Sequence, residues 1–173
     1  MEFRIEDAVS NLSATPAAVR AMVGGLKGEM AQSSGKRDDW APYDIIGHLI
    51  YCEIADWIPR ARIILEQGSN RTFEPFDRYA QFERSEGKTL ADLIEEFDEL
   101  RKQNLATLLG WQLSANQLKL EGIHPELGPV TLGQLIATWS VHDLNHIRQI
   151  ASSIARRYSD DVGAWREYLS ILN

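Results

Sequence analysis

Apolar residues recur every three or four positions through most of the chain, which is the period at which side chains share one face of an α-helix. Four long segments follow this pattern, and a shorter fifth segment ends the sequence. The five segments cover residues 5–26, 42–66, 89–109, 131–158 and 162–172. Between them no alternating pattern is long enough for a credible sheet. The pattern therefore predicts an all-α protein, a four-helix bundle with a short extra C-terminal helix.

Local signals predict where several of these helices begin. Thr15 and Pro16 have the order of an N-cap followed by proline at the first helical position. They divide the first segment into a short or kinked helix and a second helix that starts there. Thr89 is the expected N-cap of the third long segment. Thr131 and Gln134 have the spacing of a capping box at the start of the fourth.

Length and charge limit the classes of protein that this chain can belong to. A length of 173 residues suits a single domain over residues 1–173. Acidic residues outnumber basic ones by 25 to 18, and no basic run interleaves with aromatic residues, which argues against nucleic-acid binding. There is no apolar run of membrane-spanning length and no signal-peptide pattern at the first residues. We expect a cytoplasmic protein with no membrane partner.

The single cysteine, Cys52, excludes an internal disulfide and a thiolate-rich zinc site. It lies in a helical apolar pattern, where a free cysteine usually packs as a small core residue. We therefore expect no catalytic thiol at this position.

Two of the four histidines, His142 and His146, are four residues apart in the longest helical segment. That spacing places both rings on one face of the helix, in line with the apolar residues Leu135 and Trp139. Neutral imidazole is the commonest transition-metal ligand, and such a pair supplies two of the three protein ligands of an open metal site. The alternative is that each ring lies in the core and bonds to a backbone carbonyl.

His48 occupies an inward position of the second segment, so a third histidine ligand is geometrically available in a bundle. Asp44 lies one turn before it and either orients that ring or is an ordinary first-turn acid favoured by the helix dipole. His124 precedes a proline in a turn-like segment and is not expected to be a ligand. Asp143 is expected beside the ligands or on the surface.

Two features of the chain leave their structural role open at this point. The segment 70–88 mixes aromatic, charged and proline residues, as packed covers and functional lids both do. Arg101 and Asn104 border the apolar stripe of the third long segment, where solvent exposure is the ordinary outcome.

Three stretches of sequence resemble the DinB/YfiT-like superfamily of helical bundles, most closely its DinB-like branch. They are Trp-Ala-Pro-Tyr-Asp-Ile-Ile-Gly-His-Leu at 40–49, His-Pro-Glu-Leu-Gly-Pro-Val-Thr-Leu-Gly-Gln-Leu at 124–135 and Trp-Ser-Val-His-Asp-Leu-Asn-His-Ile-Arg-Gln-Ile at 139–150. The resemblance covers essentially the whole chain. It implies a divalent metal, zinc or nickel, bound by His48, His142 and His146. Members of this family have been described as metal-dependent hydrolases, as S-transferases that use low-molecular-weight thiols, and as mycothiol-dependent isomerases.

Three neutral imidazoles leave at least one metal position open. A water bound there ionises near pH ~7, and a thiol bound there is held as thiolate. The sequence therefore predicts a metal-dependent enzyme, a hydrolase or a thiol S-transferase, acting on a small molecule such as a low-molecular-weight thiol. The alternative is a non-catalytic bundle that binds a metal or small ligand, its site closed by Asp44, Glu53 or His124. Apolar helix faces would also suit a homodimer.

Two other enzyme classes fit the histidines less well. A metalloprotease needs glutamate in a His-Glu-x-x-His motif, and Asp143 stands in its place. An HD-domain phosphohydrolase would use His48, the His142-Asp143 pair and a distant acid such as Asp160. The long gap between the first two elements and the presence of His146 argue against it.

Overall fold

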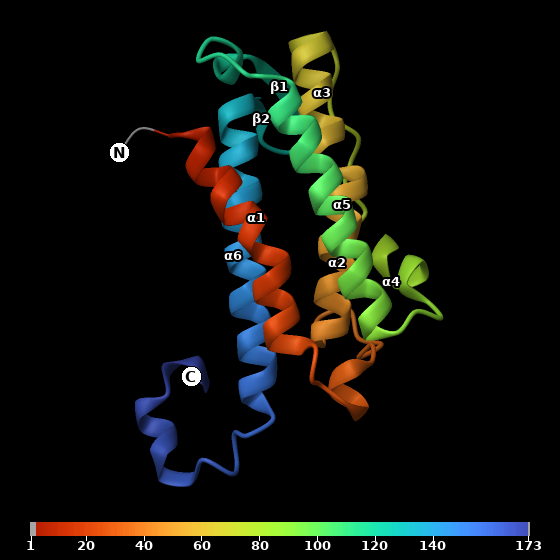
Figure 1. The fold of residues 1–173 in the computed structure, drawn as a ribbon, viewed down its shortest axis with the longest axis vertical. Helices are drawn as coiled ribbons and strands as arrows, with labels where there is room; N and C mark the ends of the chain where they lie inside the picture. Colours follow the sequence, from red (N-terminus) through yellow and green to blue (C-terminus); the bar gives the residue numbers. More distant parts are fainter. Residues whose placement is uncertain (1–2, 173) are drawn as a thin grey trace.

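The computed structural model of the chain describes residues 3–172. Long helices lie side by side along one axis, and one of them is broken in two (Figure 1). A short helix, α4, lies beside α2 in the segment that precedes α5. The helices are α1 (Ile5–Val23), α2 (Pro42–Ala55), α3 (Trp57–Gln67), α4 (Ala80–Ser85), α5 (Leu90–Gly110) and α6 (Leu132–Arg156). The predicted helical bundle is confirmed.

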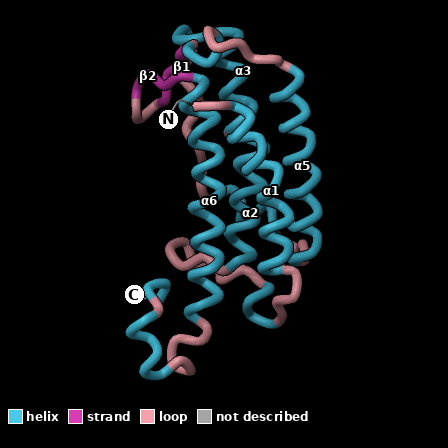
Figure 2. Tube along the Cα trace, turned by 60° about the vertical axis from the view of Figure 1, so that its left-hand side comes forward, coloured by secondary structure: helices cyan, strands magenta, loops and turns pink. Residues whose placement is uncertain are grey.

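The first two long helices of the bundle, α1 and α2, are diagonal to each other rather than adjacent. Helix α1 packs against α5 and α6, and α2 packs against the same two helices. Helices α1 and α2 therefore lie on opposite corners, as the second view also shows (Figure 2). The buried apolar side chains form two clusters along the bundle, one around α3 and one around the start of α2. Buried charged and polar residues at mid-length of α2, α5 and α6 separate the two clusters.

Helix α1 runs without interruption through Pro16, so the predicted helix start at Thr15 is wrong. Proline has no N–H to donate to the carbonyl four residues earlier, which usually weakens a helix. Here the carbonyl oxygen of Leu12 accepts a hydrogen bond from Arg101 Nη1 at 2.8 Å instead. The Thr15 hydroxyl donates to the carbonyl of Asn11 at 3.2 Å. A partner on another helix therefore allows α1 to continue past the proline.

The second predicted segment is broken at Asp56, which separates α2 from α3. Pro59 lies in the first turn of α3 and has no N–H for the carbonyl of Ala55, the residue four positions earlier. Asp56 takes backbone angles of φ −111° and ψ −79°, outside the regular helix. The proline explains the break. The spacing of the apolar residues alone does not predict it.

Both predicted capping threonines are confirmed. The Thr89 hydroxyl accepts from the backbone N–H of Asp92 at 3.2 Å. At the start of α6 the Thr131 hydroxyl accepts from the backbone N–H of Gln134 at 3.1 Å, and the Gln134 side chain accepts from the Thr131 N–H at 2.8 Å. The helix that carries two of the histidines therefore has a firmly fixed start.

The connection between α5 and α6 contains a small antiparallel hairpin, so the expectation of no sheet was wrong. Its strands are β1 (Glu121–His124) and β2 (Gly128–Thr131). The backbone N–H of Phe73 donates to the carbonyl of Ile123 at 2.9 Å. A Cβ on Gly122 would lie 2.8 Å from the Phe73 ring, so only glycine allows this approach. Strands this short depend on tertiary contacts rather than on their own pattern.

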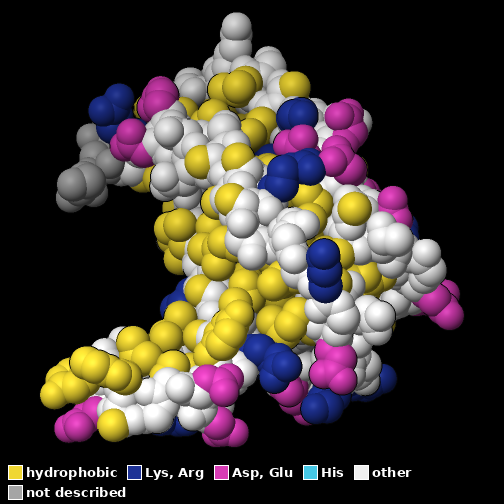
Figure 3. Space-filling model, turned by 60° about the horizontal axis from the view of Figure 1, so that its bottom comes forward, with side chains coloured by type: hydrophobic (Ala, Val, Ile, Leu, Met, Phe, Trp, Pro, Cys, Tyr) yellow, Lys and Arg dark blue, Asp and Glu magenta, His cyan; other side chains and the backbone are white. Residues whose placement is uncertain are grey.

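The expected terminal helix is present as two 3-10 helices, η4 (Gly163–Tyr168) and η5 (Ser170–Leu172). This segment projects from the end of α6 (Figure 1) and carries exposed hydrophobic side chains (Figure 3). Trp165 is 73% and Tyr168 79% exposed. The predicted apolar face of this segment is therefore not buried within the chain, and the homodimer stays a prediction.

None of the helices in the described range, 3–172, is both long enough and apolar enough to cross a membrane.

Candidate metal centre

Three histidines meet at mid-length of the bundle. His48 comes from α2, and His142 and His146 come from consecutive turns of α6. The Nε2 atom of His142 lies 3.2 Å from that of His48 and 3.1 Å from that of His146. All three ring nitrogens lie within 4.8 Å of one another, so the three predicted ligands are brought together.

The three rings are neutral at ordinary pH. Burial lowers the pKa of His48 to about 2 and that of His142 to about 3, and the neighbouring imidazoles add to the effect. Burial also lowers the pKa of His146, although the side chain of Gln149 opposes the shift. Only neutral imidazole has a lone pair to give to a metal, so the cluster is in the form that binds one.

The spacing of the ring nitrogens fits a bound divalent ion. A zinc–nitrogen distance of about 2.0–2.1 Å and tetrahedral angles place two ligand nitrogens roughly 3.3 Å apart, close to the separations found here. The side chain oxygen of Gln149 lies 2.8 Å from Nδ1 of His146. If this nitrogen carries the proton, Nε2 presents its lone pair to the cluster. The donor set therefore suits a divalent transition metal.

The histidines open into a cavity of about 780 Å³. Side chains from α2, α3, α6 and three connecting segments line it, among them Asp56, Phe76 and His124. A larger cavity, about 1070 Å³, lies around α4 and contains none of the histidines. The histidine cluster, rather than cavity size, therefore identifies the candidate site.

Aromatic rings surround the cluster. The Trp40 ring centre lies 5.1 Å from that of His48, and Phe76 meets the same imidazole edge-on at 5.8 Å. Trp57 packs edge-on against His142 at 5.1 Å. Because Phe76 belongs to the segment 70–88, that segment covers one side of the site.

With this geometry in view, comparisons with known proteins identify the family. The model of the DinB superfamily matches residues 11–150. The chain belongs to the DinB superfamily. No curated protein matches it in sequence. YfiT from Bacillus subtilis, described as a probable metal-dependent hydrolase with an unusual four-helix bundle topology, has the same fold, with a TM-score of 0.73 and 20% identity over 88% of this chain and 87% of that one.

In this DinB-superfamily chain Cys52 belongs to the buried core and also lies beside the histidine cluster. Its sulfur is 3.5 Å from Nε2 of His48 and 3.9 Å from Nε2 of His142. Burial raises the pKa of the thiol well above its usual range, and the neighbouring carboxylates raise it further. The prediction of a buried cysteine is confirmed, but sequence reasoning missed its neighbours. The signal was its position one helical turn after His48.

The Asp44 carboxylate makes no hydrogen bond to the His48 ring, whose Nδ1 atom is buried without a hydrogen-bond partner. The Oδ2 atom of Asp44 accepts from the backbone N–H of Ala41 and of Ser34, each at 2.9 Å. This is the helix-start role that was the simpler of the two readings. His124 lines the cavity, but its Nδ1 atom accepts hydrogen bonds from the backbone N–H groups of Glu126 and Leu127 at the hairpin turn, each at 3.2 Å. It lies outside the cluster, as expected.

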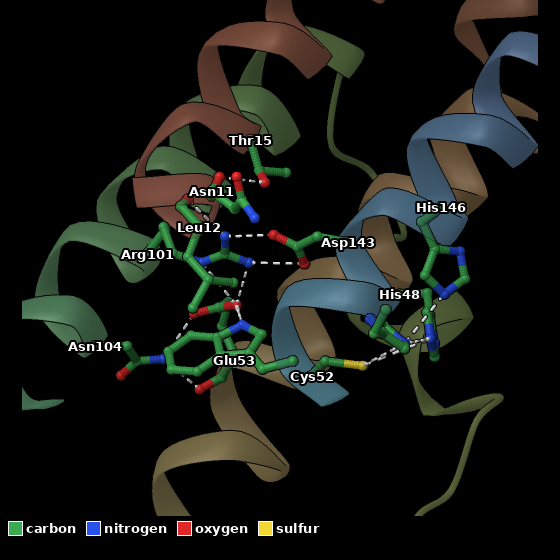
Figure 4. A network of polar contacts seen from close by, with 12 residues as sticks. Asn11, Leu12, Thr15, His48, Cys52, Glu53, Arg101, Asn104, Asp143 and His146 are labelled. Atoms are coloured by element: carbon green, nitrogen blue, oxygen red, sulfur yellow. Dashed lines mark hydrogen bonds and ion pairs between the residues drawn. The ribbon is translucent and has the colours of Figure 1, made fainter. Parts of the chain in front are cut away.

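A buried ionic network lies next to the histidines (Figure 4). Arg101 is 1% exposed, so its side chain faces the bundle interior, whereas solvent exposure is the ordinary outcome for such a residue. Its Nη2 atom lies 2.7 Å from Glu53, and its Nη1 atom lies 2.6 Å from Asp143. Asp143 is turned toward Arg101 and away from His48 and His146 (Figure 4). It is therefore a buried ion-pair partner and not a surface residue.

Glu53 is fully engaged in the same network. Asn104, whose position the sequence left open, is partly buried and donates to Glu53 Oε2 at 2.9 Å. Trp139 Nε1 donates to Glu53 Oε1 at 3.0 Å. Glu53 therefore does not close the metal site. Among the described residues, the His, Cys, Asp and Glu atoms that converge on one point are those of the three histidines alone.

A second buried ion pair lines the cavity at the break between α2 and α3. Asp56 and Arg60 are each 8% exposed, and their charged atoms are 2.9 Å apart. Burial raises the pKa of Asp56 to about 6, and the charge of Arg60 opposes this shift. Asp56 can therefore exchange a proton near neutral pH. Sequence reasoning did not single out this pair.

Proposed function

We propose that this chain is a metal-dependent enzyme in which His48, His142 and His146 bind one divalent ion, zinc or nickel. The observation that carries the proposal is the convergence of three neutral imidazole nitrogens at the edge of a cavity. Among the described residues, no fourth His, Cys, Asp or Glu ligand atom joins all three within 4.8 Å, and the Cys52 sulfur lies near His48 and His142 only. Structural zinc sites are normally closed by four protein ligands, whereas catalytic sites keep one position open.

Hydrolysis of a small molecule is the reaction that the site supports best. When bound, a divalent ion there would supply Lewis-acid chemistry. Asp56 lines the same cavity with a pKa of about 6, so its carboxylate can take up a proton near pH 7. The structural likeness to YfiT, described as a probable metal-dependent hydrolase, agrees with this choice.

Thiol S-transfer is a second candidate, and the apolar wall of the cluster favours it. The rings of Trp40, Trp57 and Phe76 and the thiol of Cys52 contact the histidines. Such a wall suits a soft, weakly hydrated sulfur atom. A low-molecular-weight thiol would then be one substrate, and the sulfur acceptor the other.

The first test is metal analysis of untagged protein after purification without added metal. We expect about one divalent ion per chain in the wild type and none in His48→Ala or His142→Ala. His124→Ala is the matched control, because this histidine lines the cavity without joining the cluster. Circular dichroism would show that all variants remain helical.

Metal retained in the His142→Ala variant, or absent from the wild type after reconstitution, would refute the proposal. A metal-loaded protein would then be tested against hydrolysable esters and amides and against thiols with electrophilic acceptors. Metal binding without turnover of either class would leave the non-catalytic alternative.

A further inference from the structure

The cavity that holds the histidines has three cationic side chains in its wall, Arg37, Arg60 and Arg78. Arg60 is already neutralised, since its guanidinium pairs with the buried carboxylate of Asp56 at 2.9 Å. Within residues 3–172 the other two arginines have no carboxylate oxygen within 4.0 Å. Two guanidinium groups at the cavity are therefore free to bind an anion.

Both free guanidinium groups are supported by aromatic rings. Arg78 lies over Trp40 and Tyr79, 5.8 and 5.9 Å from the ring centres, and Arg37 lies over Tyr79 at 4.7 Å. A guanidinium stacked on an aromatic face keeps its N–H donors at the edge, where they can bond to a carboxylate or phosphate. Stacking also restricts the side chain before a ligand arrives.

Arg78 is linked to the histidines through a single aromatic ring, that of Trp40. The Trp40 ring on which it rests also packs against His48, with ring centres 5.1 Å apart. The charge of Arg78 contributes to the lowered pKa of both His48 and His146, so its field reaches the cluster. The other charges acting on the histidines belong to the Arg101 network, where they are paired.

We propose that the substrate carries an anionic group, a carboxylate or a phosphate, which Arg78 binds while the reacting atom lies at the histidine cluster. Arg37 is the second donor for the same group. A charge-assisted, two-point contact of this kind orients the substrate as well as binding it. Two exposed carboxylates, Asp38 and Glu126, also line the cavity. These two carboxylates could instead bind a cationic substrate, so the test must distinguish an anionic from a cationic substrate. The inference rests on the proposed metal site.

The test uses cobalt-loaded protein and two thiols of equal length, 6-mercaptohexanoate and neutral 6-mercaptohexanol. Binding of either sulfur to cobalt is followed by its thiolate charge-transfer absorption, which needs no turnover. We expect the carboxylate thiol to bind about three- to tenfold more tightly at low salt, since exposed ion pairs contribute modestly and are screened by salt. 6-Aminohexanethiol, the cationic counterpart, should bind least tightly.

Arg78→Gln should remove the preference for the carboxylate and leave the dissociation constant of 6-mercaptohexanol unchanged. Arg78→Lys should keep part of the preference, because it retains the charge but not the planar fork. The control is Arg84→Gln, which removes an exposed arginine of α4 that does not line the cavity.

Equal binding of the charged and neutral thiols, tighter binding of the amine, or an unchanged preference in Arg78→Gln would overturn the anion site alone. Loss of affinity for both thiols in that variant would also overturn it, since Arg78 would then support the fold of the site. Failure to bind cobalt would instead refute the proposed metal centre, and the anion site with it.

Discussion

Replacing Arg101 by methionine should be among the most damaging single changes in this protein. The arginine donates five hydrogen bonds, to Glu53, Asp143 and the carbonyl of Leu12. The two carboxylate side chains are 0% and 2% exposed, so water cannot replace the lost partner. Methionine fills a similar volume, which separates the loss of charge from the creation of a cavity.

The magnitude follows from the burial of the remaining charges. Removing one partner of a buried ion pair typically costs about 3–5 kcal/mol, because an uncompensated charge is left in the interior. Glu53 keeps its bonds from Trp139 and Asn104, whereas Asp143 loses the partner that neutralises it. We therefore expect the free energy of unfolding to fall by about 4 kcal/mol, which for a chain of this size lowers the Tm by roughly 10 °C.

The assay is urea unfolding followed by far-ultraviolet circular dichroism, with Arg62→Met as control because Arg62 is exposed on α3. The deficit should be smaller at pH 5 than at pH 8. Burial already raises the pKa of Glu53, and without Arg101 nothing cationic opposes that shift. A carboxyl group whose pKa is higher in the folded than in the unfolded protein lowers the free energy of unfolding as the pH rises.

Two results would refute this reasoning. One is a loss below about 1 kcal/mol, which is the scale of an exposed ion pair. The other is a failure of Glu53→Gln to recover any stability in the Arg101→Met background. That second change removes one of the two stranded charges, so it should recover part of the loss if charge is the cause.

Three further predictions test the site and its surroundings. Asp44→Asn should lower the unfolding free energy by about 1 kcal/mol in urea titrations, yet leave metal stoichiometry unchanged; loss of metal would restore a role beside His48. Gln149→Ala should weaken metal affinity about 10- to 100-fold in chelator competition, since it removes the partner of His146; unchanged affinity would contradict this. Burial lowers the pKa of His142 to about 3, below its unfolded value, so metal-free protein should lose up to about 1.4 kcal/mol per pH unit as the pH falls below 6.5. Urea titrations of His142→Phe should lack that contribution.

Features set by neighbouring residues were predictable from the sequence. The capping signals at Thr89 and Thr131 place two helix starts correctly, because a cap depends on residues within one turn. The pairing of His142 with His146 is equally local, since four residues make one helical turn. His48 joins this pair only because α2 packs against α6. Local pattern does not predict that packing, whereas the family resemblance implied that His48 belongs with the pair.

Features set by distant residues were not predictable in the same way. Arg101 becomes buried because Glu53 and Asp143, 48 and 42 residues away in sequence, reach it from two other helices. The same guanidinium bonds to the carbonyl of Leu12, which explains why Pro16 does not end α1. A residue that is ordinarily exposed and a proline that ordinarily starts a helix thus change roles together through one long-range contact.

The break at Asp56 gives one face of α2 and α3 its role in the site. His48, Cys52, Asp56 and Arg60 follow one another at intervals of four residues, and all four line the cavity. In a straight helix each interval of four advances the side chain by about 40° around the axis, so the last would point roughly 120° away from the first. In this chain the helix is interrupted at Asp56, and the four side chains share one cavity. Pro59 has no N–H for the hydrogen bond to Ala55 that a continuous helix would make, and the ion pair lies on the same cavity as the three histidines.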